Sequence, residues 1–139
     1  MPDAAYRVAH VSEIVTPAEA EPGEARWHAT RIHFGIGSFG VGAYVAEAAG
    51  DVLTSDHSEI EDSGTRHEEL FFVASGRAAF RIGEEAVDVA AGTFVYVSDP
   101  AVVRGATALE PGTTLVAVGG EPGKAFEISP WEREYADGE

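Results

Sequence analysis

The stretch from His67 to Gly76 combines titratable side chains with the pattern of a β-strand. It reads His-Glu-Glu-Leu-Phe-Phe-Val-Ala-Ser-Gly and stops at a glycine suited to a turn. Strand alternation sends His67, Glu69, Phe71 and Val73 to the same side. Because a carboxylate on a buried face needs a metal, a cation or a hydrogen-bond donor, the surroundings of Glu69 are where chemistry is expected.

A second group of ligand-type residues, His57 and Glu59, lies just upstream. If the acidic stretch 60–66 is an insertion between two neighbouring strands, these two side chains share one face and converge with His67 and Glu69. Two imidazoles with one or two carboxylates suit Mn²⁺, Fe²⁺, Ni²⁺ or Zn²⁺ with positions left open for water or substrate. The chain has no cysteine, so histidine, carboxylate and water are the available ligands.

Two motifs resemble those of the cupin superfamily. Cupins carry a His-x-His pair, a Glu a few residues later and a Gly seven residues after that Glu, then a Gly-x5-Pro-x-Gly stretch that leads to a third His. Glu69 and Gly76 have the separation of the first motif, residues 83–92 resemble the start of the second, and residues 100–104 resemble its end. The resemblance covers roughly residues 36–120.

Both motifs are degenerate at the positions that hold metal in cupins. Ser63 and Thr65 stand where the histidine pair is expected, Ala90 replaces the usual proline, and Arg104 stands where the third histidine would be. The resemblance therefore implies the fold more strongly than the usual metal site.

The position of Arg104 leaves three readings of the site open. A guanidinium there would repel a metal ion, and it could pair with Glu69 as a bidentate ion pair in place of a metal. Inside an apolar cavity beside Tyr44 and Tyr96, it could instead bind the carboxylate, phosphate or enolate of a small ligand. In a metal-free enzyme, His67 or Glu69 would move a proton while Arg104 held an anionic substrate.

The cupin resemblance implies an all-β, double-stranded β-helix, or jelly-roll barrel, with a small-molecule site at its mouth. We expect an N-terminal arm at 1–25, the barrel at 26–125 and a C-terminal tail at 126–139. Many cupins are metal-dependent dioxygenases, isomerases, decarboxylases or lyases, and His57, His67 and Glu69 would be the ligands here. A non-catalytic ligand-binding module remains an alternative, so enzymatic activity is left open. Cupin habit and the apolar residues of the arm favour a homodimer.

Short apolar segments separated by glycine and proline predict strands throughout, and no long segment has helical periodicity. The expected strands are 6–14, 27–34, 38–47, 52–57, 68–74, 78–82, 86–89, 93–97, 102–108 and 113–118. Small residues around Tyr44 predict that this tyrosine lines a cavity. At least two of Phe72, Phe80 and Phe94 are expected to be largely buried, and Trp131 is expected to anchor the tail.

Composition limits the remaining possibilities. With 139 residues, 45% of them hydrophobic, the chain can bury one core. A formal charge of −15 with nine Lys and Arg excludes the basic footprint that nucleic acids and anionic membranes require. No apolar run predicts a transmembrane helix and no signal peptide is recognisable, so a cytoplasmic protein is expected. The preference for arginine over lysine is typical of a bacterium with a GC-rich genome.

Overall fold

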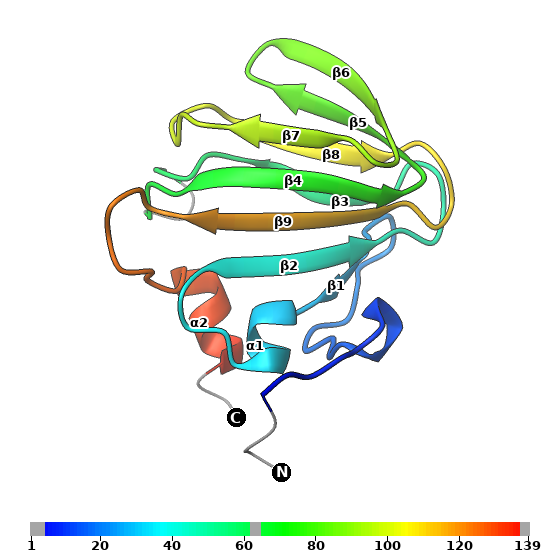
Figure 1. Cartoon of the computed structure of the whole chain (residues 1–139). Helices are drawn as coiled ribbons and strands as arrows, with labels where there is room; N and C mark the ends of the chain where they lie inside the picture. Colours follow the sequence, from blue (N-terminus) through cyan, green and yellow to red (C-terminus); the bar gives the residue numbers. More distant parts are fainter. Residues whose placement is uncertain (1–4, 62–64, 137–139) are drawn as a thin grey trace.

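The computed structural model describes residues 5–61 and 65–136, which form two antiparallel sheets packed face to face (Figure 1). One sheet has five strands in the order β1-β2-β9-β4-β7, and the other has four in the order β3-β8-β5-β6. The strands are β1 Arg26–His28, β2 Gly40–Val45, β3 Val52–His57, β4 Glu68–Ser75, β5 Arg77–Ile82, β6 Glu85–Ala90, β7 Phe94–Val97, β8 Arg104–Ala108 and β9 Thr114–Gly120. The helices are η1 Val11–Glu13, α1 Thr30–Phe34 and α2 Pro130–Ala136. The predicted all-β jelly roll is confirmed.

The core lies between the two sheets and is built by strand alternation. Phe71 and Val73 of β4 point inward, as predicted, and meet Phe80 of β5 and Leu115 of β9. The rings of Phe71 and Phe80 pack edge to face with centroids 5.3 Å apart. Because side chains alternate along a strand, the inward direction of Phe71 and Val73 means that Glu69 also points inward.

The expectation for the other phenylalanines is wrong. Phe80 is buried, but Phe94 is 62% exposed and Phe72 is only half-buried. Phe72 and Phe94 are cross-strand partners in the β4–β7 pair, and both lie on the outer face of the five-stranded sheet. Their rings pack against each other there, 4.6 Å apart.

A tight turn joins β4 to β5 at Gly76. This residue has φ +77°, and a Cβ added to it would lie 2.2 Å from Oγ1 of Thr113. Thr113 is itself buried, and its Oγ1 donates to the carbonyl of Glu110 at 2.7 Å and lies 3.1 Å from that of Arg77. The glycine seven residues after Glu69 is thus required both by backbone conformation and by the close approach of Thr113.

The N-terminal arm is not the edge strand that residues 6–14 predicted; its regular structure is the single turn η1. The predicted strand 27–34 is also divided, because β1 ends at His28 and α1 begins at Thr30. At this junction His28 is buried and its Nδ1 contacts the carbonyl of Ile14 at 3.0 Å. Contacts with the arm therefore end β1 early, and these could not be read from the local pattern.

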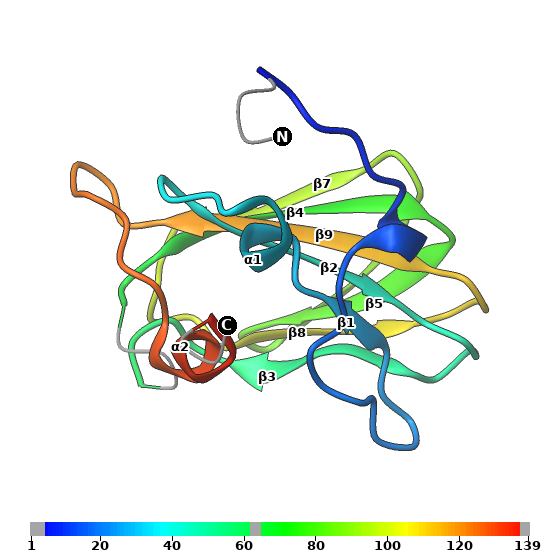
Figure 2. The same ribbon diagram turned by 90° about the horizontal axis from the view of Figure 1, so that it is seen from below.

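Helices α1 and α2 lie next to each other below β2 (Figure 1), and a view turned by 90° shows α2 beside one end of the two sheet layers (Figure 2). Nε of Arg31 donates to Glu132 at 2.6 Å, with both side chains largely buried. Trp131 packs on Trp27 of β1 with ring centroids 5.0 Å apart, which agrees with the predicted anchor. In the described ranges, no helix is long and apolar enough to cross a membrane.

Candidate functional site at one end of the barrel

A cavity of about 480 Å³ opens between the sheets at the end where α2 lies. Its walls come from β2, β3, β4, β9 and the C-terminal segment. On β2 and β9, Gly40, Gly42 and Gly119 face this space, and Tyr44 lines it as predicted. A Cβ at Gly42 would lie 3.2 Å from Nε1 of Trp27, and one at Gly40 would lie 3.2 Å from the ring of Phe126. The missing side chains therefore leave room for the aromatic rings that line the cavity.

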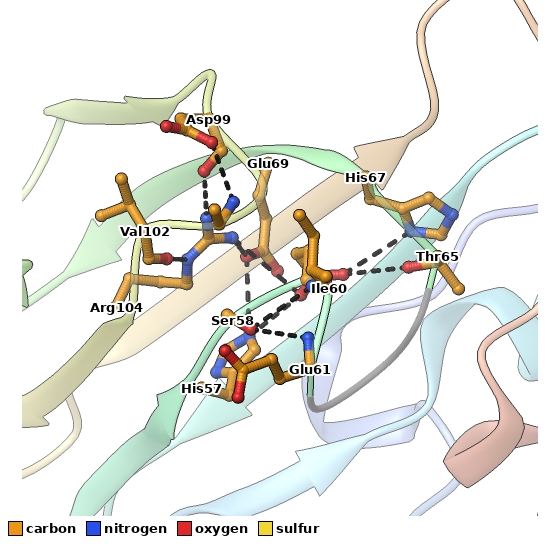
Figure 3. Close-up of polar contacts among 12 residues, drawn as sticks. His57, Ser58, Ile60, Glu61, Thr65, His67, Glu69, Asp99, Val102 and Arg104 are labelled. Atoms are coloured by element: carbon orange, nitrogen blue, oxygen red, sulfur yellow. Dashed lines mark hydrogen bonds and ion pairs between the residues drawn. The ribbon is translucent and has the colours of Figure 1, made fainter.

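His57, Glu59, Glu69 and Arg104, which we call the polar cluster, lie within 4 Å of one another in successive pairs, and the first three line this cavity. Figure 3 shows His57, Glu69 and Arg104 directed toward one another. Nε2 of His57 lies 3.0 Å from Oε2 of Glu59 and 3.7 Å from Oε1 of Glu69. His57 comes from the four-stranded sheet and Glu69 from the five-stranded sheet. The cluster thus joins the two sheets, and the predicted convergence of residues 57, 59 and 69 is what the structure shows.

Arg104 lies behind the carboxylates and is completely buried. Its Nη1 donates to Oε1 of Glu69 at 2.9 Å, Nε donates to the carbonyl of Val102 at 2.8 Å, and Nη2 donates to that of Asp99 at 2.9 Å (Figure 3). The predicted ion pair with Glu69 is present, but it is made by Nη1 alone and is not bidentate as predicted. Arg104 is not part of the cavity lining, and each of its three nitrogens donates one hydrogen bond. Its predicted contact with an anionic ligand stays a prediction.

The carboxylates control the protonation of His57. Burial alone lowers the pKa of this imidazole, but hydrogen bonds to Glu59 and Glu69, and one to the Ser55 carbonyl, outweigh burial and raise the pKa to about 10. In the metal-free protein an imidazolium therefore balances one carboxylate while Arg104 balances the other. Burial, with nearby Glu69, also raises the pKa of Tyr44, so its phenol keeps its proton and remains a donor.

His67 lies at the edge of the polar cluster rather than inside it. Its Nδ1 is 3.8 Å from Oε1 of Glu59, the oxygen that also accepts from Thr65. Its ring packs on Phe126 with centroids 5.4 Å apart, and it lines the cavity. Within the described ranges, the side chains close enough to share a metal ion are His57, Glu59 and Glu69, without His67. Its predicted roles as ligand and proton carrier stay predictions.

Tyr96 is a correction to the predicted site. It lies on the outer face, 58% exposed, and its hydroxyl donates to Glu68. The β4–β7 register pairs Tyr96 with Leu70, which also faces outward, whereas Val97 pairs with Glu69 and faces inward. Because side chains alternate along β7, Tyr96 points outward and does not face the cavity.

The lining residues that were not predicted as site residues include three aromatic side chains and a carboxylate, those of Trp27, Phe126, Trp131 and Glu132. Three of them belong to the C-terminal segment, which the resemblance to cupin motifs does not reach. The anchoring role expected for Trp131 was the one available signal, because an aromatic side chain packed on the barrel mouth also forms part of its wall.

The polar cluster fits a divalent metal ion by two observations. Nδ1 of His57 contacts the Ser55 carbonyl at 2.8 Å, so Nε2 is the ring atom directed at the carboxylates, as in many metal sites. Ligand atoms about 2.0–2.2 Å from one ion stand roughly 3–3.5 Å apart. The spacing from Nε2 to Glu59 is 3.0 Å, within this range, and that to Glu69 is 3.7 Å, slightly beyond it, so a small movement of one side chain would complete the site. A group of one histidine and two glutamates suits a first-row ion, whose identity this geometry leaves open.

No family model and no curated protein sequence matches this chain. Among solved structures, a cupin protein from Bacteroides fragilis aligns with a TM-score of 0.63 and 15% identity over 90% of this chain and 92% of that one. A cupin-superfamily sugar phosphate isomerase from Silicibacter pomeroyi aligns with a TM-score of 0.56 and 15% identity, over 67% of this chain and 57% of that one. KdgF from Halomonas sp. aligns with a TM-score of 0.50 and 16% identity, over 66% and 71%.

The agreement with these structures is one of architecture, and it extends over most of the barrel. The fold predicted from the resemblance to cupins is confirmed, and the chain has the cupin fold.

Proposed function

We propose that this protein is a small-molecule enzyme with a divalent metal centre held by His57, Glu59 and Glu69. The observation that carries the proposal is the convergence of these three ligand groups, from β3, the loop after it and β4, in the lining of a cavity large enough for a metabolite. Cupin neighbours named as a sugar phosphate isomerase and as KdgF support small-molecule chemistry in this fold.

Each ligand group is held by a residue behind it. Thr65 donates to Oε1 of Glu59, and Arg104 donates to Oε1 of Glu69. The Ser55 carbonyl orients the His57 ring. Such supporting hydrogen bonds fix the direction of a ligand and tune its basicity, so the site is built before any ion binds.

We expect proton-transfer chemistry of the isomerase or lyase type. A bound metal would polarise a substrate carbonyl or lower the pKa of a coordinated water. His67 faces the cavity within 3.8 Å of Glu59, which suits it to carry a proton to or from the substrate. Tyr44 supplies a protonated hydroxyl on the neighbouring wall, where it can donate to a substrate oxygen.

The test is elemental analysis of protein purified without a histidine tag, followed by titration of the chelator-treated protein with Mn²⁺, Fe²⁺, Ni²⁺ and Zn²⁺. We expect about one ion per chain, and loss of binding in the variants His57→Ala and Glu69→Gln. His10→Ala removes an exposed histidine outside the cluster and is the matched control. No retained metal, and equal weak binding by all variants, would contradict the metal centre.

A metal-free acid–base enzyme is the second candidate, because Arg104 already supplies Glu69 with a cation at 2.9 Å. In that case Glu59 and His67 would move the proton, and activity would survive exhaustive chelation. Turnover that persists in EDTA but is lost in His67→Gln would favour this candidate over the metal centre. Absence of turnover with a broad substrate panel in either state would leave a ligand-binding module.

A further inference from the structure

Most of the charged residues that line the cavity are acidic. Five acidic residues contribute to its walls, namely Glu24, Asp56, Glu59, Glu69 and Glu132, and His57 is the cation set against them. Among the described residues, the lining includes no lysine and no arginine. The chain as a whole carries a formal charge of −15, which adds a field of the same sign.

Two ion pairs beside the cavity strengthen this asymmetry, since the acidic member of each lines the cavity and the arginine does not. Glu69 and Glu132 line the cavity, whereas their partners Arg104 and Arg31 do not. The side chain of Asp56 is about half exposed and pairs with the exposed Arg81, so it adds little to this effect. A negative ligand would therefore lose its hydration against two carboxylates with each compensating guanidinium on the far side. A positive ligand would face the attractive end of both pairs.

Aromatic rings form the wall near Glu132. Trp27 and Trp131 meet with centroids 5.0 Å apart at an interplanar angle of 59°, so their faces form a corner. Tyr44 and Phe126 line the same cavity. The faces of such rings attract an ammonium group, and most strongly where it is partly desolvated.

We propose that the cavity binds a small organic cation, an amine or quaternary ammonium compound, between the corner formed by Trp27 and Trp131 and the carboxylate of Glu132. This inference rests on the proposed function, because it takes the cavity as the ligand site, and it names the class of substrate. In the polar cluster His57 is held by Glu59 and Glu69, so the cationic group of the ligand belongs at the aromatic end.

The test compares three probes of equal shape: choline, its uncharged isostere 3,3-dimethylbutan-1-ol, and the anion 3,3-dimethylbutanoate. Binding is measured by calorimetry and by quenching of tryptophan fluorescence. We expect choline to bind at least about tenfold more tightly than the alcohol, and the anion not to saturate. Anion binding equal to or tighter than that of choline would overturn the inference while leaving the metal centre intact. Absence of binding by all three would overturn it as well, and metal analysis would then decide separately on the proposed function.

Two variants locate the cation. Trp131→Leu keeps an apolar side chain but removes the ring, and we expect about a fivefold loss of choline affinity with no change for the alcohol. Glu132→Gln removes the charge, with Glu134→Gln, exposed on the same helix, as the matched control. If Glu132→Gln unfolds because Arg31 loses its partner, the choline affinity of Trp131→Leu still tests whether the cation binds at the aromatic end. Unchanged choline affinity in Trp131→Leu would overturn the assignment.

Discussion

The two ends of the space between the sheets are built by the same strands but are filled in opposite ways. On β4, Glu69 lies in the polar cluster, and two residues later Phe71 lies in a dry core. On β8, Arg104 holds the carboxylates, and two residues later Ala106 is a fully buried core residue. Residues two apart on a strand point to the same side, so each pair faces the space between the sheets. One end is therefore charged and the other apolar only because different residue types occupy these positions.

This contrast shows how a buried charged cluster can be accommodated in a small domain. Taking ionised groups out of water is costly, and their mutual attraction repays that cost only with good geometry. The apolar end contributes burial free energy and holds the backbone of β4 and β8 in a fixed register, which supplies the geometry. The following substitutions break one end or the other.

Removal of Arg104 should have the largest effect. Arg104→Ala leaves Glu69 buried without its cation and two carbonyls without donors, so we expect a loss of about 5 kcal/mol in the free energy of unfolding. Urea denaturation measures it. The double variant Arg104→Ala, Glu69→Ala should be more stable than Arg104→Ala alone, because no unpaired charge remains. Additive losses would contradict the pairing.

At the apolar end, Phe80→Ala should cost about 4 kcal/mol, because it leaves a hole beside Phe71 in a closely packed core. Phe94→Ala is the matched control on the outer face, and its loss should be well under half as large. Chemical denaturation of both variants compares them. Equal losses would mean that the outer face is covered in solution, as in the homodimer predicted from the arm.

The arm packs against the junction of β1 and α1, and its removal should have an intermediate effect. The arm buries Ile14, and Ala29 donates to the carbonyl of Val15 at 2.8 Å. Deletion of residues 1–24 should therefore lower stability by about 2 kcal/mol. Thermal melting measures the loss, and size-exclusion mass tests the predicted dimer at the same time. Residues 1–4 of the arm lie outside the described ranges; an unchanged melting temperature would show that the contacts of residues 5–24 contribute nothing.

At the charged end, the pKa of His57 predicts a pH dependence. The folded-state pKa of about 10 lies above the unfolded value of about 6.5, so the stabilisation is fully present below pH 6.5 and is lost as pH rises towards 10. For chelator-treated protein we expect about 1–2 kcal/mol less stability at pH 9.5 than at pH 6.5, since partial exposure screens the interaction. His57→Gln should flatten this profile, and a slope that persists in this variant would assign it to other groups.

Sequence patterns predicted most of the barrel because glycine and proline separate its strands. The expected segment 52–57 has the bounds of β3, and 78–82 differs from β5 by one residue. Helices α1 and α2 were missed because they are one to two turns long and depend on packing, such as the contact between Arg31 and Glu132. Helices this short have no periodicity to detect.

The part of the site whose residues are two apart in the sequence, such as His57 and Glu59, could be predicted. The directions of the Tyr96 and Phe94 side chains could not be predicted, because they depend on how β7 pairs with β4. The aromatic wall was also out of reach, since Trp27 and Trp131 are brought together only by the folded chain. The boundaries of arm, barrel and tail stay a prediction.

The two halves of the polar cluster stand on strands with different numbers of neighbours. Glu69 belongs to β4, which is hydrogen-bonded on both sides, to β9 and to β7. His57 ends β3, an edge strand that pairs with β8 and, at Val52, forms a single bridge with Glu24; the pairing with β8 shifts register between Thr54 and His57. Amide hydrogen exchange should thus be slow along β4 and fast along β3. Glu69 would then keep its position, while His57 could move to coordinate ions of different radius.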